Sequence, residues 1–327
     1  MTTAPPIRVV AAAVQATPVF LDREATVERA CALVSEASAH GAGLVVLPEA
    51  FIPGYPDWVW RSPAWDDSGF HDVLFDQAVD VPGPAVDRLC EASADGGVWV
   101  AVGVNERAAE SSTLYNTLLY LSPDGRLAGM HRKLMPTGGE RSVWGQGDGS
   151  TLTVLDTPFG HLGGLICWEN YMPLARAAMW AQGVDVFVAP TWDNSDTWVA
   201  TLRHIAREGR VHVVGSNTCM RSSDVPRELE GAERLYGGDD WMSRGNTAIV
   251  GPDGTVLAGP LVGETGILYA QLDVAAARRG RREFDPVGHY ARPDVFRLVV
   301  DDRPMRPVSF CQHVEVTSLP EDSGTLS

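Results

Sequence analysis

Three strand-like segments of the chain end close to a side chain that can do chemistry. Glu49 follows a leucine- and valine-rich run and a proline, Lys133 follows a strand-like segment, and Cys167 follows Gly163-Gly164-Leu165-Ile166. In open α/β sheets, functional groups gather just beyond the carboxyl ends of the strands. A carboxylate, an ammonium group and a thiol brought together in this way can act as proton acceptor, charge stabiliser and nucleophile.

The surroundings of the cysteine favour chemistry over a purely structural role. A free cysteine is usually a small buried hydrophobic residue, and Cys31 and Cys90 fit that description because they lie on the inner faces of expected helices. Cys167 does not, because Trp168-Glu169-Asn170 surrounds it with polar groups. A glycine-rich strand that ends at a nucleophile and then turns into a helix has the form of a nucleophile elbow, with sulfur in place of oxygen.

The other two side chains have plainer interpretations when each is taken alone. A glutamate after a proline can simply open a solvent-exposed loop, and a lysine beside apolar residues can extend its stem to the surface. The presence of all three residues in one chain is what favours catalysis.

The segments between these side chains predict an α/β protein. Apolar runs predict strands, residues at helical spacing predict helices between them, and two Pro-Asp-Gly turns predict hairpins. The expected strands are 9–14, 44–47, 98–104, 114–121, 127–131, 162–166, 184–189 and 211–215, and the expected helices are 23–40, 84–94, 173–182 and 197–209. This alternation predicts helices that cover mixed sheets within one domain, residues 1–283. A tail, 284–327, follows, and its last residues, 318–327, are expected to be disordered.

Composition and charge exclude several classes of partner. The 327 residues carry a formal net charge of −16 and a pI of about 4.8, which disfavours nucleic acids and anionic membranes. No apolar run approaches the ~18 residues of a membrane span. The N-terminus lacks a signal-peptide pattern, so a cytoplasmic protein is expected. The absence of CxxC pairs, phosphate-binding glycine loops and histidine clusters argues against a disulfide framework, a metal or a cofactor.

Taken together, the three segments resemble the signature regions of the nitrilase superfamily of carbon–nitrogen hydrolases. These regions are Leu47–Pro56 around the glutamate, His131–Thr137 around the lysine and Ile166–Asn170 around the cysteine, in the family's order. The resemblance extends from about residue 8 to about residue 300. It implies a four-layer αββα sandwich of two mixed sheets.

The resemblance also implies roles for the residues of the site. Glu49, Lys133 and Cys167 carry over as the catalytic triad, and Glu140 matches a second glutamate that positions the lysine and the substrate. Lys133 and the backbone N–H of Trp168 are expected to stabilise negative charge on nitrogen. Aromatic residues near the signature loops predict a pocket for apolar nitriles. The candidates for substrate binding are Tyr55, Trp144, Trp168, Pro190, Thr191 and Trp192.

The motif Cys167-Trp168-Glu169-Asn170, with a tryptophan directly after the cysteine, resembles the motif of the true nitrilase branch of the superfamily. That branch hydrolyses a nitrile to a carboxylic acid and ammonia through a thioimidate and an acyl-enzyme, here on Cys167. An amidase or carbamoylase and a cyanide hydratase or dihydratase are alternatives on the same scaffold, and a non-catalytic assembly protein is a third. A histidine base, His131 or His204, is a further alternative, although structural hydrogen bonding is the expected role of both.

The expected partners are a small-molecule nitrile, water and further copies of the chain. The resemblance implies a homodimer that builds a larger homo-oligomer or spiral. The segment Leu229–Asp240 and the tail after Phe284 are the expected interface elements.

Overall fold

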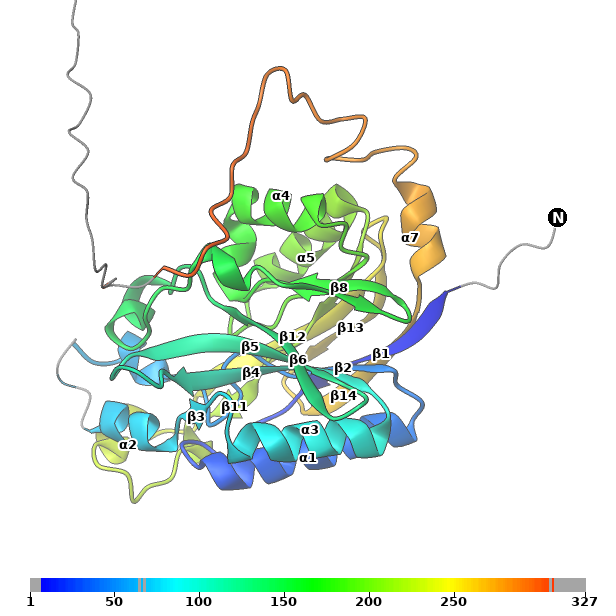
Figure 1. Cartoon of the computed structure of the whole chain (residues 1–327). Coiled ribbons are helices and arrows are strands. Elements are labelled where there is room, and N and C mark those ends of the chain that lie inside the picture. Colours follow the sequence, from blue (N-terminus) through cyan, green and yellow to red (C-terminus); the bar gives the residue numbers. More distant parts are fainter. Residues whose placement is uncertain (1–6, 64–65, 67–68, 306–307, 309–327) are drawn as a thin grey trace, which may run out of the picture.

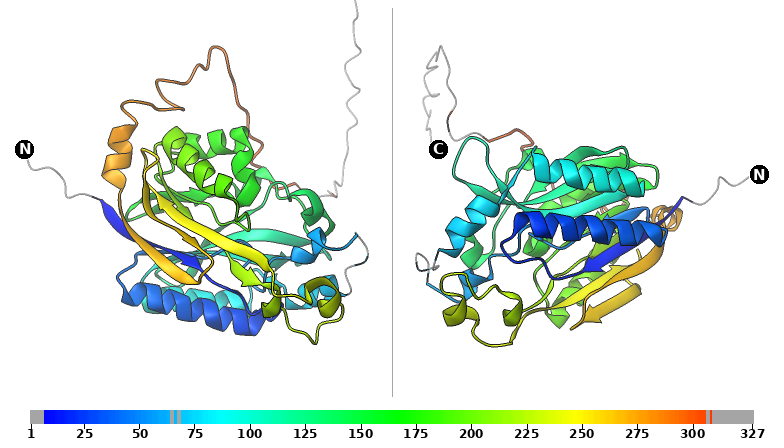
Figure 2. Two further views of the ribbon diagram at one scale, coloured as in Figure 1. Left: turned by 180° about the vertical axis from the view of Figure 1, so that it is seen from behind. Right: turned by 90° about the horizontal axis from the view of Figure 1, so that it is seen from below.

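The computed structural model describes residues 7–63, 66, 69–305 and 308. Within these residues the strands form two seven-stranded sheets, whose inner faces share one apolar core. Helices cover the outer face of each sheet, as Figures 1 and 2 show. The predicted four-layer αββα sandwich of two mixed sheets is therefore confirmed.

The first sheet has the strand order β14-β1-β2-β4-β5-β6, and β3 pairs with the end of β4. Strands β1, β2 and β4 are parallel, whereas β14, β5 and β6 join the sheet by antiparallel pairing. The bounds are Arg8–Gln15 (β1), Leu44–Val46 (β2), Val79–Asp80 (β3), Trp99–Arg107 (β4), Leu114–Ser122 (β5), Arg126–Arg132 (β6) and Gly266–Asp273 (β14).

The second sheet has the strand order β11-β12-β10-β9-β8-β7, and β13 pairs with β12. Its centre, β8, β9 and β10, is parallel, and the flanking strands are antiparallel. The bounds are Val154–Thr157 (β7), Gly160–Gly164 (β8), Val186–Val188 (β9), His212–Gly215 (β10), Cys219–Arg221 (β11), Trp241–Val250 (β12) and Val256–Val262 (β13).

Two helices cover each sheet. Helices α1 (Arg23–Ala39) and α3 (Pro84–Gly96) lie on the first sheet, and α4 (Pro173–Ala181) and α5 (Asp196–Gly209) lie on the second. Helix α1 begins where the side chain of Asp22 accepts the N–H of Ala25 at 3.0 Å, which is the usual N-cap bond. The shorter helices are α2 (Phe70–Gln77), α6 (Ala232–Tyr236), α7 (Val274–Gly280) and the 3₁₀ turns η1 (Asp57–Trp60), η2 (Gly138–Ser142), η3 (Gly149–Thr151), η4 (Cys167–Tyr171) and η5 (Ser222–Asp224).

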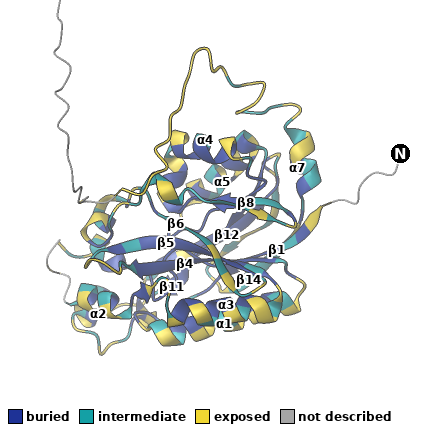
Figure 3. Cartoon of the chain, in the orientation of Figure 1, coloured by how far each residue is buried: buried dark blue, intermediate teal, exposed yellow. Residues whose placement is uncertain are grey.

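The central strands are buried on both faces, as the dark ribbons of Figure 3 show. One face of β1 and β2, with Ala11, Leu44 and Val46, meets Leu162 and Val186 of the second sheet. The opposite face lies under helices α1 and α3. Strands covered on both sides become continuous apolar runs instead of alternating ones. This burial explains why short apolar runs predicted these strands correctly.

The C-terminal segment leaves the sandwich after α7. From residue 281 onward the described part of the chain contains no helix or strand. The segment crosses the side that carries α4 and α5 (Figure 1) and returns to η3, where the N–H of Met305 donates to Asp148 Oδ2 at 2.7 Å. Residues 318–327, which were expected to be disordered, lie outside the described residues. Within the described chain, no helix is both long and apolar enough to span a membrane.

Candidate active site

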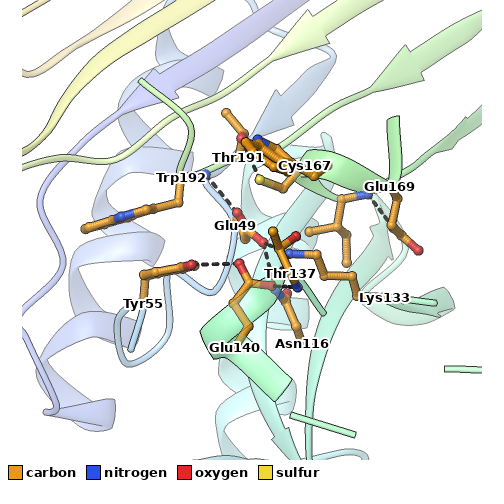
Figure 4. Close-up of polar contacts among 12 residues, drawn as sticks. Glu49, Tyr55, Asn116, Lys133, Thr137, Glu140, Cys167, Glu169, Thr191 and Trp192 are labelled. Atoms are coloured by element: carbon orange, nitrogen blue, oxygen red, sulfur yellow. Dashed lines mark hydrogen bonds and ion pairs between the residues drawn. The ribbon is translucent and has the colours of Figure 1, made fainter. Parts of the chain in front are cut away.

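The three strand-end residues converge on one point between the two sheets, as Figure 4 shows. Glu49 follows β2, Lys133 follows β6 and Cys167 follows β8, each within three residues of the end of its strand. All three side chains are buried. Lys133 contacts Glu49 directly, and both lie close enough to Cys167 to change the pKa of its thiol, which supports the prediction that these residues meet.

Cys167 occupies a sharp turn between strand and helix. Its φ is 52°, in the left-handed region that a residue with a side chain rarely adopts. The turn is held by the N–H of Cys167, which donates to the carbonyl of Pro190 at 2.9 Å. The side-chain amide of Asn170 also donates to the carbonyls of Leu165 and Cys167, both at 2.9 Å. This is the geometry of a nucleophile elbow, in which local strain presents the reactive atom.

A glycine before the elbow lets two parallel strands approach closely. A Cβ atom on Gly164 would lie 2.0 Å from the carbonyl oxygen of Val188 on β9. No side chain fits in that space, so the glycine is required where β8 leads into the elbow.

A buried network of hydrogen bonds and ion pairs joins the two glutamates to the lysine. Lys133 Nζ donates to Glu49 Oε1 and to Glu140 Oε2, both at 2.7 Å. Glu49 Oε1 also accepts from the amide of Asn116 at 2.8 Å, and its Oε2 accepts the backbone N–H of Trp192 at 2.7 Å. Every side-chain group in this network is fully or almost fully buried. One cation therefore holds two carboxylates in fixed positions.

Burial and charge act in opposite directions on these groups. Burial raises the pKa of Glu49, and Lys133 only partly offsets that rise. Burial opposes the charge on Lys133, but Glu49 and Glu140 outweigh it and raise the pKa of the lysine. Burial and the charge of Glu49 raise the pKa of Cys167, against the lowering effect of Lys133. The resting site thus holds a protonated thiol, a charged lysine and a carboxylate with increased proton affinity.

A hydroxyl group orients the thiol. Thr191 Oγ1 lies 3.0 Å from Cys167 Sγ and donates to it. The N–H of Asp193 donates to the same Oγ1 at 2.9 Å, which occupies the acceptor side of the hydroxyl and leaves its proton for the sulfur. A hydroxyl donor stabilises negative charge that develops on the thiol.

Comparison with known proteins identifies the family to which this site belongs. A family model described as "Carbon-nitrogen hydrolase" matches residues 10–282. The chain belongs to the carbon–nitrogen hydrolase family. An aliphatic nitrilase of Sinorhizobium fredii (strain HH103) is 48% identical, over 91% of this chain and 97% of its own. A bifunctional nitrilase/nitrile hydratase of Lupinus angustifolius is 43% identical, over 94% of this chain and 89% of its own.

Solved structures share the fold of this carbon–nitrogen hydrolase. A Saccharomyces cerevisiae member of branch 10 of the nitrilase superfamily has a TM-score of 0.69 at 21% identity, covering 88% of this chain and 99% of that one. A carbon–nitrogen hydrolase of Helicobacter pylori G27 has a TM-score of 0.70 at 22% identity, covering 88% and 97%. The predicted membership of the nitrilase superfamily is confirmed.

A pocket of about 490 Å³ opens at the thiol of this hydrolase. Of the predicted substrate-binding residues, Tyr55, Trp168 and Trp192 line it. The rings of Tyr55 and Trp192 stack with centroids 4.5 Å apart, and the hydroxyl of Tyr55 donates to Glu140 Oε1 at 2.6 Å. Trp168 is half-exposed at the wall. The pocket is therefore partly aromatic, and one of its aromatic residues is bonded directly to the buried network.

The other three predicted substrate-binding residues are not part of the pocket lining. Trp144 lies behind Tyr55, below the ammonium of Lys133, and its indole N–H donates to Asn105 Oδ1 at 2.9 Å. Pro190 and Thr191 contact the elbow instead, through the bonds described above. In this structure the polar atoms of these three residues support the network and the thiol, and their direct contact with a substrate stays a prediction.

Glu169 and His131 connect the cysteine elbow to the lysine segment. Glu169 accepts the N–H of Ile166 at 2.7 Å and the N–H of Leu134, and it lies 3.0 Å from His131 Nε2. His131 Nδ1 faces the carbonyl of Thr151 at 2.9 Å. Both ring nitrogens of His131 are therefore occupied. This histidine is structural, as expected.

The second candidate histidine does not belong to the site. His204 lies on α5, where its side chain is 69% exposed and its Nε2 is 3.8 Å from Glu208. Across the described residues, no group of three or more His, Cys, Asp and Glu side chains could hold a metal ion.

Sequence reasoning missed Asn116 and Asp193. Asn116 lies within the apolar strand β5, where an amide side chain is a weak sign of a buried polar partner. Asp193 follows Trp192 in a loop that has no strand or helix pattern. A role for Asn116 could have been suspected from its position in an apolar strand, whereas nothing in the local sequence indicated a role for Asp193.

Proposed function

We propose that this hydrolase is a nitrilase that converts an organic nitrile and two water molecules to a carboxylic acid and ammonia. The observation that carries the proposal is the buried network in which Lys133 binds Glu49 and Glu140 beside the thiol of Cys167. The relatives that are 43–48% identical over most of their length are named as nitrilases, which supports the nitrile as substrate.

The first half of the reaction forms a bond between sulfur and carbon. The sulfur of Cys167 attacks the nitrile carbon while Glu49 takes the thiol proton, which then passes to the nitrile nitrogen to give a thioimidate. Lys133 stabilises the negative charge that develops on nitrogen. The N–H of Trp168 lies in the first turn of η4, where helical N–H groups lack an internal acceptor, and it serves as a second donor.

The second half of the reaction breaks the carbon–nitrogen and carbon–sulfur bonds. Water, deprotonated by Glu49, adds to the thioimidate carbon, and ammonia leaves after the proton is returned to nitrogen. A second water then cleaves the thioester, which releases the acid and restores the thiol of Cys167. Glu140 keeps Lys133 charged and in place through both halves, and Thr191 orients the sulfur.

A small amount of amide is expected as a second product. The tetrahedral adduct of the first water can lose sulfur instead of nitrogen, which releases the amide. The Lupinus angustifolius relative is named for both nitrilase and nitrile hydratase activity. The same branching on this chain is part of the proposal.

The experiment that tests the proposal compares a nitrile with its matching amide. Purified protein is incubated with an aliphatic nitrile, the corresponding amide or cyanide, and ammonia, acid and amide are measured. Ammonia and acid from the nitrile are expected, and Cys167→Ala should abolish both while the oligomer persists. Turnover of the amide alone would indicate an amidase or carbamoylase, and turnover of cyanide alone would indicate a hydratase or dihydratase. An intact oligomer without any turnover in the wild type would favour an assembly protein.

We also propose that the hydrolase domain, residues 1–283, assembles through Leu229–Asp240 and the segment after Phe284 into homodimers and then larger homo-oligomers or spirals. The described part of the C-terminal segment supports this proposal, because Phe296 is 77% exposed and Val299 is 81% exposed. Apolar side chains exposed to this extent are typical of interfaces. Elution of the 35.2 kDa chain only as a monomer in size-exclusion chromatography would contradict the proposal.

A cytoplasmic location is proposed on the basis of the cysteines. In the described part of the chain, four cysteines are free thiols. Reduced thiols are the usual state in the cytosol. Cell fractionation of the native host, followed by an activity assay, would test the location.

A further inference from the structure

The pocket beside Cys167 contains negative charge that the proposed reaction does not use. Its lining includes three carboxylates, Glu140, Asp57 and Asp193, but no Lys, Arg or His side chain among the described residues. Glu140 is bound to Lys133. The other two carboxylates, of Asp57 and Asp193, differ in whether the protein supplies a cation to them.

Asp57 is neutralised within the protein. Its side chain is almost fully buried and forms an ion pair with Arg61. Arg61, Tyr236 and Trp192 all lower the pKa of its carboxyl, against the larger rise that burial causes. Asp57 therefore supports the wall of the pocket without leaving a free negative charge in it.

Asp193 is held equally firmly, but only by neutral groups. Its Oδ2 accepts the indole N–H of Trp168 at 2.9 Å, and its Oδ1 accepts the N–H of Ser195 at 2.9 Å. Its carbonyl accepts the amide of Asn217 at 2.7 Å, which fixes the backbone as well. No ion pair among the described residues involves this carboxylate, whereas Asp57 pairs with Arg61 and Glu140 pairs with Lys133. A fixed, partly exposed negative charge thus remains in the wall of the pocket.

Aromatic side chains lie around this charge. Trp60, Trp168 and Trp192 also line the pocket. The face of an indole ring attracts a cation, so these rings and Asp193 favour the same sign of charge. Asp193 would repel a carboxylate on a bound molecule, and the described lining contains no cationic side chain to bind that carboxylate.

We propose that the pocket selects nitriles that carry a positive charge, such as an ammonium group, away from the nitrile and disfavours nitriles that carry a carboxylate. Asp193 is the residue that determines this preference. The inference rests on the proposed nitrilase function, because it concerns the substrate of the same site.

A matched series of substrates tests the proposal on the wild-type enzyme. Hexanenitrile, 5-aminopentanenitrile and 5-cyanopentanoate share a four-carbon spacer and differ in the charge of the far end. The expected order of kcat/KM is ammonium, then neutral, then carboxylate, with about ten-fold between neighbours for a single charge several ångströms away. Salt should narrow these differences, because it screens a charge at a partly solvated wall. Equal kcat/KM for the ammonium and carboxylate substrates would overturn the proposal.

Variants then assign the preference to Asp193. Asp193→Asn should reduce the ammonium-to-carboxylate ratio of kcat/KM about ten-fold or more. Asp193→Glu keeps the charge and should retain the preference. Asp95→Asn removes the same charge from an exposed position on α3 and should leave this ratio unchanged. An unchanged ratio in Asp193→Asn would overturn the assignment.

The outcomes separate this proposal from the proposed function. If no nitrile in the series or among other aliphatic nitriles is hydrolysed, the nitrilase proposal fails. If hexanenitrile is hydrolysed but the charged substrates do not differ, the nitrilase proposal stands and only the charge selection fails. If Asp193→Asn does not fold, the wild-type series and its salt dependence still decide.

Discussion

Lys133 is the only lysine in the sequence, and its ammonium group contacts two buried carboxylates. Replacing it with methionine keeps an unbranched apolar stem of similar length and removes the charge. Glu49 and Glu140 would then share a buried site without a cation. Removal of one partner from a buried ion pair typically costs about 3–5 kcal/mol. We expect Lys133→Met to lose about that much free energy of unfolding at pH 8.

The pH dependence of this loss follows from the direction of the pKa shift. Burial already raises the pKa of Glu49, and the loss of Lys133 removes a cause that lowers it. A carboxylate whose folded pKa lies above its unfolded value destabilises the fold at high pH. This penalty decreases as the pH falls through the folded pKa towards the unfolded one. The deficit of Lys133→Met should therefore shrink by about 1.4 kcal/mol per pH unit wherever the folded variant binds one additional proton.

Denaturant unfolding at pH 8, 7 and 6 measures both the deficit and its slope. Arg126→Met removes an exposed cation from β6 and is the matched control, with an expected change within about 0.5 kcal/mol. A single lysine also permits a direct measurement, because ¹³Cε-lysine labelling gives one resonance, from Lys133. Since the two carboxylates raise its pKa, this resonance should remain that of the ammonium form at pH 10.5, the ordinary pKa of lysine.

Activity and a second substitution complete the test. Loss of the charge that stabilises the transition state should reduce kcat about a hundred- to a thousand-fold. Adding Glu140→Gln to Lys133→Met removes one of the two uncompensated carboxylates, so it should recover stability at pH 8 but not activity. If Lys133→Met is as stable as the wild type at pH 8 and its stability difference does not vary with pH, the electrostatic account of the network is wrong.

Three further predictions concern the groups around the network. Thr191→Val should lower kcat/KM about ten-fold, because the thiolate of Cys167 loses a hydrogen-bond donor. For the same reason iodoacetamide should alkylate Cys167 more slowly, which peptide mass spectrometry measures. An unchanged alkylation rate would contradict this role of Thr191. Asn116→Leu should shift the acidic limb of the pH profile of kcat/KM to higher pH, because Asn116 lowers the pKa of Glu49, the general base. A shift to lower pH would refute this role of Asn116. Gly164→Ala should cost about 3 kcal/mol or more in denaturant unfolding, since the strand β9 leaves no room for Cβ. The control Gly41→Ala, with φ of +82° but open space, should cost only about 1 kcal/mol, and equal losses would show that close approach is not the cause.

The sheet centres could be predicted from sequence because burial on both faces produces a local signal. Strands β2 and β9 are apolar along their length and β1 is apolar between its first and last residues, and the helices beside them show apolar residues at helical spacing. The antiparallel edges could not be predicted in this way. Strand β14 pairs with β1 along eight residues, although Arg8 and its partner Asp273 are separated by most of the chain. Most of its residues are only partly buried, so its local pattern is weak.

The same contrast holds within the site. Glu49, Lys133 and Cys167 could be predicted because each follows a strand-like segment and the three occur together in the order of the nitrilase signature regions. The supporting bonds could not, because they join residues that are far apart in sequence. Asn116 reaches Glu49 across 67 residues, and the N–H of Trp192 reaches it across 143. A backbone N–H carries no sequence signal at all, since every residue except proline has one.

The choice of Glu49 as the base depends on these distant bonds more than on its motif. An ionised carboxylate has about four lone-pair sites. Glu169, two residues after the nucleophile, uses both oxygens for two backbone N–H groups and for His131. It cannot take a proton without releasing the elbow from the lysine segment. Glu49 has three donors, which leaves one site, on Oε2. Glu140 also accepts from three donors, but its free lone-pair site is on Oε1, the oxygen that binds Tyr55. Glu140 also affects the pKa of Cys167 less than Glu49 does. Glu49 is therefore the carboxylate that can accept the thiol proton while every other contact in the site is kept.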